Sequence, residues 1–160
     1  MMPSTQQIYD WLEDVKDPEI PVLSLVDLGV ITEVAIQDNA VRVEMTPTFA
    51  GCPAMDVMKS EVIEKLKSKG LAEVIVNVSF KKPWSSDLIS DKGKKALKQF
   101  GLAPPPSNKV LHDLEILENA TCPRCNGENT ELKNPFGPTL CRAIYYCHTC
   151  HEAFEQFKPL

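Results

Sequence analysis

Between a predicted strand and a predicted helix the chain reads Thr46-Pro47-Thr48-Phe49-Ala50-Gly51-Cys52-Pro53. Before this stretch, Val41, Val43 and Met45 alternate with other residues, as in a half-buried strand. After it, apolar residues recur at helical spacing over residues 54–68, and Gly70 is suited to end the helix. The stretch therefore joins a strand to a helix, which is a connection typical of a sheet with a helix packed on it.

The elements on either side extend this pattern. Ser4 and Gln7 have the spacing of a capping box and precede an amphipathic helix that we expect to end at Asp17-Pro18. Residues 30–36 and 41–45 predict a hairpin, residues 73–80 a third strand, and residues 90–100 a further helix. We therefore predict a small α/β (α+β) domain over residues 1–103, with a three-stranded or larger sheet covered by helices.

Cys52 is a candidate reactive thiol or soft-metal ligand. Pro53 fits the first turn of the helix that follows, so Cys52 is expected at or just before the helix N-terminus. Backbone N–H groups and the helix dipole there stabilise a thiolate, and we expect them to lower the pKa of Cys52. The alternative is that Cys52 is a small buried apolar residue.

The other five cysteines lie near the C-terminus. Cys122 and Cys125 form one C-x-x-C motif, and Cys147 and Cys150 form a second one after 21 intervening residues. Four thiolates in this pattern predict a tetrahedral zinc site in a zinc ribbon over residues 121–160, with rubredoxin-like iron or disulfides as alternatives. A segment this short has a small core, so we expect the metal to contribute folding energy. A closed four-sulfur site has no open position, and we do not expect it to be catalytic.

A linker is expected over residues 104–120, where Pro104, Pro105 and Pro106 favour an extended spacer. Apolar residues at 110–117 could form a strand that anchors the tail. Cys141 belongs to neither C-x-x-C motif. It is a bystander, a ligand of a second site, or a partner of Cys52.

Composition excludes several function classes. The net charge is −5, and neither part of the chain is basic when it is divided after Pro106, which disfavours nucleic-acid binding. No apolar run approaches a membrane span and no signal peptide is visible, so we expect a cytoplasmic protein without a membrane partner. The first histidine is His112, which leaves the first domain without a histidine base for a thiol enzyme.

Four short motifs appear in order in the first part of the chain: Asp17-Pro18-Glu19-Ile20, Val26-Asp27-Leu28-Gly29, Thr46-Pro47-Thr48 with Gly51-Cys52-Pro53, and Pro83-Trp84-Ser85-Ser86-Asp87. Together they resemble the MIP18 family, also called domain of unknown function 59. The resemblance implies an α/β fold and a role in iron–sulfur assembly or metal-enzyme maturation, and it places the family's motif cysteine at Cys52. Transient binding of iron or an iron–sulfur cluster by Cys52, and by Cys141, is an expectation of this resemblance.

The tail carries a second resemblance. Residues 136–143, the two C-x-x-C motifs and Glu152-Ala153-Phe154 are similar to the tail of the D (or J) subunits of bacterial phenylacetyl-CoA 1,2-epoxidase. This resemblance implies an accessory role in phenylacetate degradation, in maturation of the oxygenase complex, with the other oxygenase subunits and the iron–sulfur assembly machinery as partners. A non-catalytic structural or docking subunit and a general iron–sulfur assembly factor remain as alternatives. In each of these roles the chain is expected not to be catalytic itself.

Overall fold

The computed structural model of the chain describes residues 1–106 and 120–158. The contacts group into two compact units, Met1–Trp84 and Ser85–Leu160, and each unit has its own sheet. The apolar segment 110–117, which we expected to anchor the tail, lies outside the described residues. No helix in the described ranges is both long and apolar enough to cross a membrane.

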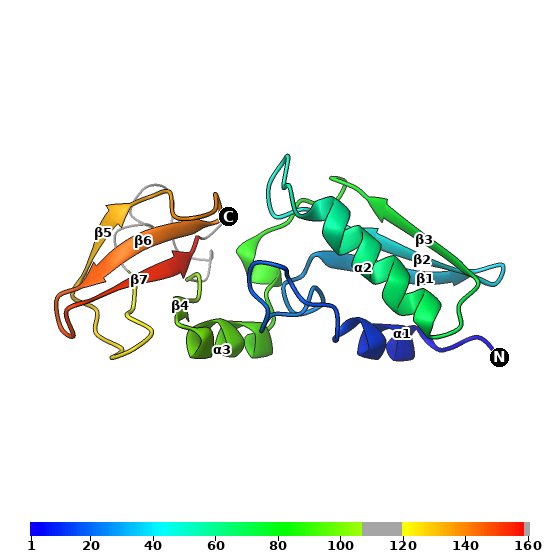
Figure 1. The fold of residues 1–160 in the computed structure, drawn as a ribbon, viewed down its shortest axis with the longest axis horizontal. Helices are drawn as coiled ribbons and strands as arrows, with labels where there is room; N and C mark the ends of the chain where they lie inside the picture. Colours follow the sequence, from blue (N-terminus) through cyan, green and yellow to red (C-terminus); the bar gives the residue numbers. More distant parts are fainter. Residues whose placement is uncertain (107–119, 159–160) are drawn as a thin grey trace. The chain divides into compact units, whose positions relative to one another are not determined.

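The first unit is built on a three-stranded sheet with the order β1-β2-β3 (Figure 1). Strands β1 (Ile31–Gln37) and β2 (Ala40–Met45) form the predicted antiparallel hairpin, in which Val34 lies opposite Val43. Strand β3 (Glu73–Val78) runs parallel to β2, and helix α2 (Met55–Ser68) makes the connection between them. The parallel pairing of β2 and β3 requires such a crossover, which explains why the stretch 46–53 must turn the chain from strand into helix.

Helices α1 (Thr5–Leu12) and α2 cover one face of this sheet (Figure 1). The predicted capping box is confirmed, because Ser4 Oγ accepts from Gln7 N at 3.2 Å and Gln7 Oε1 accepts from Ser4 N at 2.9 Å. The core lies between the helices and the sheet, and its fully buried side chains include Ile8, Leu12, Val43, Val62 and Leu66. The predicted α/β (α+β) fold is therefore confirmed.

The opposite face of the sheet carries polar side chains, including those of Arg42, Glu44 and Asn77. This one-sided arrangement is typical of sheets that contain antiparallel strands and face water on one side. The third strand is shorter than predicted, since it ends at Val78 and the side chain of Phe80 is 62% exposed. The prediction that Phe80 continues the buried face is wrong, because pairing stops where Ser79 N donates to Met45 O and the chain turns away at Lys81.

The second unit contains the 3₁₀ turn η1 (Ser86–Leu88), helix α3 (Asp91–Phe100) and a four-stranded sheet. The sheet has the order β4-β7-β6-β5, formed by β4 (Leu102–Ala103), β5 (Thr130–Asn134), β6 (Arg142–Cys147) and β7 (Glu152–Phe157). Strands β5, β6 and β7 are an antiparallel meander, and β4 pairs parallel with β7. Tyr145 and Phe154 stack within the core of this unit, with ring centroids 5.5 Å apart.

Residues 85–103, which we expected as the last part of the first domain, pack with the ribbon strands in the second unit. Gly101 adopts a left-handed conformation (φ 95°) at the end of α3 and redirects the chain into β4. Leu102 and Ala103 then pair with Glu155 and Gln156 of β7. A two-residue strand with a partner about 50 residues away leaves no local pattern in the sequence, so this pairing was not predicted.

Candidate functional site

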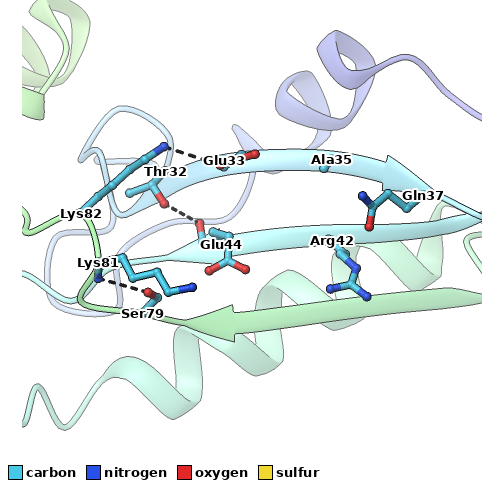
Figure 2. Close-up of a pocket in the computed structure, with 9 residues that line it drawn as sticks. All are labelled: Thr32, Glu33, Ala35, Gln37, Arg42, Glu44, Ser79, Lys81 and Lys82. Atoms are coloured by element: carbon cyan, nitrogen blue, oxygen red, sulfur yellow. Dashed lines mark hydrogen bonds and ion pairs between the residues drawn. The ribbon is translucent and has the colours of Figure 1, made fainter.

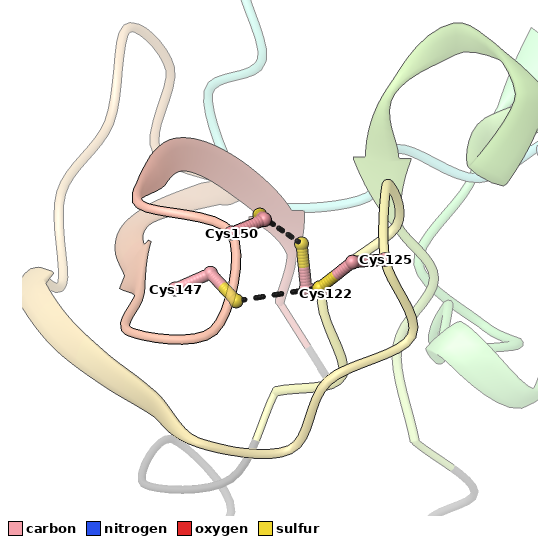
Figure 3. A group of neighbouring side chains, drawn as sticks. All are labelled: Cys122, Cys125, Cys147 and Cys150. Carbon is pink, nitrogen blue, oxygen red and sulfur yellow. Dashed lines mark hydrogen bonds between the residues drawn. The ribbon is translucent and has the colours of Figure 1, made fainter.

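Four cysteine thiols converge at one end of the second sheet, as the two C-x-x-C motifs predicted (Figure 3). Cys122 and Cys125 come from the loop before β5, whereas Cys147 ends β6 and Cys150 lies in the turn to β7. All four Sγ atoms lie within 4.8 Å of one another. Cys122 Sγ is 3.7 Å from Cys150 Sγ, and Cys125 Sγ is 3.6 Å from Cys147 Sγ.

Both motifs fold as the same turn. Asn126 follows Cys125 with a left-handed φ of 59°, and its N–H donates to Cys122 O at 3.0 Å. His151 follows Cys150 with a φ of 60°, and its N–H donates to Cys147 O at 2.9 Å. Left-handed backbone is uncommon outside glycine, and Asn and His are among the residues that adopt it more readily. Each turn thus aims two sulfurs at one point.

The arrangement fits a tetrahedral zinc ion. With Zn–S bonds of about 2.3 Å, the edges of a ZnS₄ tetrahedron are about 3.8 Å long, close to the two short sulfur–sulfur distances. Cys122, Cys125, Cys147 and Cys150 would hold the ion and fill every tetrahedral position. When it is bound, the metal would crosslink the loop before β5 to the turn between β6 and β7. The geometry supports a structural metal, plausibly zinc, rather than an open catalytic one.

The four thiols differ in acidity when no metal neutralises them. Backbone N–H groups of Cys150 and Thr149 lower the pKa of Cys147 to about 6. Burial, with a smaller effect from the neighbouring thiols, raises the pKa of Cys150 to about 12. Metal binding must therefore displace protons from the cluster, as thiolate sites require.

Two contacts that support the first turn escaped the sequence analysis. Gly127 N donates to Cys125 Sγ at 3.3 Å, and a Cβ atom built on Gly127 would lie 2.8 Å from Thr149 Oγ1. Lys98 Nζ of α3 donates to Asn126 Oδ1 at 2.5 Å, although the sequence suggested only a solvated helix face there. The glycine two residues after Cys125 was a signal for a close approach, whereas nothing local indicated the Lys98 contact.

Cys52 lies in the loop between β2 and α2, two residues before Ala54, the N-cap residue of the helix. Its side chain is half-buried, and Gly51 before it takes a left-handed φ of 78°. The structure corrects the expected acidity of this thiol. Burial raises the pKa of Cys52 above its ordinary value, and this effect outweighs the backbone N–H of Ala54, which lowers it.

The Asp17-Pro18-Glu19 motif contributes to this effect. The negative charges of Glu19 and Asp17 also raise the pKa of Cys52, so the structure brings this motif near the cysteine loop. Asp17 Oδ1 accepts from Glu19 N and Ile20 N, both at 2.8 Å, which fixes the turn that carries the two carboxylates. An acidic environment of this kind favours a protonated thiol and attracts a cation.

The remaining motif residues of the first unit have mostly structural contacts. Asp27 is buried and accepts from Ser24 Oγ at 3.0 Å. Trp84 is buried and donates from Nε1 to Leu28 O at 2.9 Å, beside the left-handed Gly29. Thr46 is 1% exposed, and its N–H donates to Val30 O at 2.8 Å. The other motif positions are Pro47, Thr48 and Pro53 in the cysteine loop and Asp87 in η1 of the second unit.

Cys141 is a buried residue of the second unit, next to the start of β6. Its Sγ lies 3.0 Å from Thr139 Oγ1, and it is not part of the four-cysteine cluster. Cys52 belongs to the first unit, so the sequence-predicted thiols are distributed over both units. A role for either thiol toward iron stays a prediction.

A concavity of about 320 Å³ lies on the open face of the first sheet (Figure 2). Its walls include Arg42 and Glu44 of β2, and Lys82 forms an ion pair with Glu33 at 3.5 Å. Figure 2 shows these side chains over the strands, with Thr32 directed to the carbonyl of Glu44. None of the sequence-predicted site residues lines this concavity, so it is separate from both cysteine sites.

Comparisons with known proteins agree with both halves of this description. Residues 5–80 match the family described as "Iron-sulfur cluster assembly protein", and residues 106–158 match the "PaaD zinc beta ribbon domain". A protein of Escherichia coli K12, named as the D-type component of a "Putative 1,2-phenylacetyl-CoA epoxidase", is 32% identical over 98% of this chain and 93% of its own length.

Two shorter relatives match the first unit and its surroundings. A "Fe-S protein maturation auxiliary factor" of Porphyromonas gingivalis is 38% identical over 54% of this chain and 84% of its own length. The crystal structure of a domain of unknown function 59 from Bacillus anthracis has a TM-score of 0.54 and 34% identity, over 57% of this chain and 89% of that one. The chain therefore belongs to the MIP18 (domain of unknown function 59) iron–sulfur assembly family, in the group that carries a PaaD zinc beta ribbon after the α/β domain.

Proposed function

We propose that this chain is an accessory protein that supports iron or iron–sulfur maturation of a phenylacetyl-CoA oxygenase complex in the cytoplasm. The observation that carries the proposal is the pairing, in one chain, of an iron–sulfur assembly domain with the PaaD zinc ribbon. Shorter relatives named as iron–sulfur maturation factors share only the first part, whereas the relative named as an epoxidase component shares the whole chain. The ribbon thus distinguishes this group from general maturation factors.

Two sites divide the work in this proposal. The four-cysteine site holds structural zinc and maintains the ribbon, because a closed set of thiolates offers no exchangeable position. Cys52 is the exchangeable soft ligand, since it lies at the start of a helix beside the carboxylates of Asp17 and Glu19. Its raised pKa means that iron must displace a proton to bind there, which makes loading reversible.

The proposal is tested by producing the oxygenase subunits with and without this chain and measuring the iron of the purified complex. We expect lower iron in the complex that forms without the chain. Cys52→Ser should lower client iron in the same way, while the variant keeps its zinc and its circular dichroism. Cys141→Ser is the matched control, because it removes a buried thiol from the other unit. Full client iron in the absence of the chain would contradict the proposal.

A second candidate function is a structural subunit that holds no transferable metal. The burial of Cys52 and the upward shift of its pKa favour this alternative, because they also suit an inert thiol. Stable co-purification at fixed stoichiometry, with unchanged client iron in Cys52→Ser, would support it. Iron loading of an iron–sulfur protein outside phenylacetate degradation would instead indicate a general assembly factor.

A further inference from the structure

We propose that the loop between β5 and β6, residues 135–141, is the surface by which the ribbon docks on the oxygenase. The Phe136 loop, as we call this segment, would insert Phe136 and Leu140 into an apolar pocket edged by carboxylates on that partner. The inference rests on the proposed function for the identity of the partner. The loop itself is assigned from its exposure, its rigidity and its charge.

The exposure of the loop is unusual for its residue types. The side chain of Phe136 is 61% exposed and that of Leu140 is 57% exposed, although both belong to one short loop. Pro135 and Pro138 are exposed in the same segment. Large apolar side chains that gather at one surface site mark protein contacts, and aromatic residues are enriched there.

The loop is also fixed in shape. Gly137 N donates to Arg142 O at 2.8 Å, and Arg142 N donates to Thr139 O at 3.2 Å. Phe136 N donates to Asn134 Oδ1 at 2.9 Å, which anchors the start of the loop. A Cβ atom on Gly137 would lie 3.1 Å from Arg142 O, so the two sides of the loop are in close contact. A loop held in this way loses little conformational entropy on binding.

One cation accompanies the apolar side chains. Lys158 Nζ lies 5.0 Å from the centre of the Phe136 ring and donates to Pro135 O at 3.2 Å. Lys158 has no ion pair within the described part of the chain. The complementary surface would therefore place an acidic group beside its apolar pocket, and this is the chemistry that we assign to the partner.

The experiment measures binding of the full-length, zinc-loaded chain to the purified oxygenase subunits by isothermal titration calorimetry. Phe136→Ala with Leu140→Ala is expected to weaken the affinity about tenfold or more, as loss of a central apolar anchor does. The matched control is Phe80→Ala, which removes a 62% exposed phenylalanine from the first unit and should leave the affinity unchanged. Zinc content shows that each variant keeps its ribbon. Lys158→Gln should reduce the salt dependence of binding.

Equal affinity of the double variant and the wild type would overturn the inference, and so would absence of any wild-type binding. Sedimentation velocity identifies a second copy as the occupant, because self-association that requires Phe136 without an effect on oxygenase affinity also contradicts our assignment. The iron content of the oxygenase, measured with and without the chain, decides the proposed function separately. Full iron loading by a variant that no longer docks would therefore separate docking from maturation.

Discussion

Gly127 supports the metal site by having no side chain. Because a Cβ atom at this position would lie 2.8 Å from Thr149 Oγ1 and 3.1 Å from Cys125 Sγ, Gly127→Ala must displace one of the two turns. We expect zinc affinity to fall about tenfold or more, as when a support of a metal ligand is lost. Competition with a chromophoric chelator measures this loss. Glu128→Ala, at the exposed neighbour, is the control, and an unchanged affinity of Gly127→Ala would contradict the steric argument.

Tyr145 makes the ribbon sensitive to high pH. Burial raises the pKa of its phenol from 10.0 to about 12. A raised pKa in the folded state contributes stability that is fully present below pH 10 and is lost as the pH rises through about 12. Absorbance at 295 nm during alkaline titration should show a late-ionising tyrosine that is missing in Tyr145→Phe. Titration of all tyrosines below pH 10 would disagree with this burial.

At the scale of single elements, α1 depends on its N-terminal cap. The helix has only eight residues and its capping box satisfies two backbone N–H groups, so Ser4→Ala should destabilise the first unit by about 1 kcal/mol. Urea denaturation followed by tryptophan fluorescence measures the change. Ser4→Thr keeps the hydroxyl and should cost less, whereas equal losses in both variants would show that the cap is not responsible.

The sequence predicted elements wherever the signal was local. Ser4 with Gln7, the hairpin turn and the two C-x-x-C motifs are patterns within a few residues, and the structure confirms them. Phe80 was placed wrongly because alternation alone does not show where strand pairing stops. The acidity of Cys52 was predicted with the wrong sign, since burial of the loop and the charges of Asp17 and Glu19 depend on distant parts of the chain.

At the scale of the whole molecule, the two units have separate cores, and the candidate metal site belongs to the second alone. Removal of the metal with EDTA should therefore unfold the ribbon, whose small core depends on the crosslink, and leave the sheet β1-β2-β3 intact. Hydrogen exchange read by mass spectrometry distinguishes the two regions. Loss of protection in both units at once would contradict their independence, and retained protection in both would contradict a structural metal.

The position of the second C-x-x-C motif has a consequence for synthesis on the ribosome. The first unit is complete at Trp84, whereas Cys150 is translated about 65 residues later. At roughly 5–20 residues per second, several seconds separate the two events. The first unit can therefore fold around Cys52 before a complete set of zinc ligands leaves the ribosome. The order of translation alone reduces the chance that Cys52 is captured in the wrong metal site.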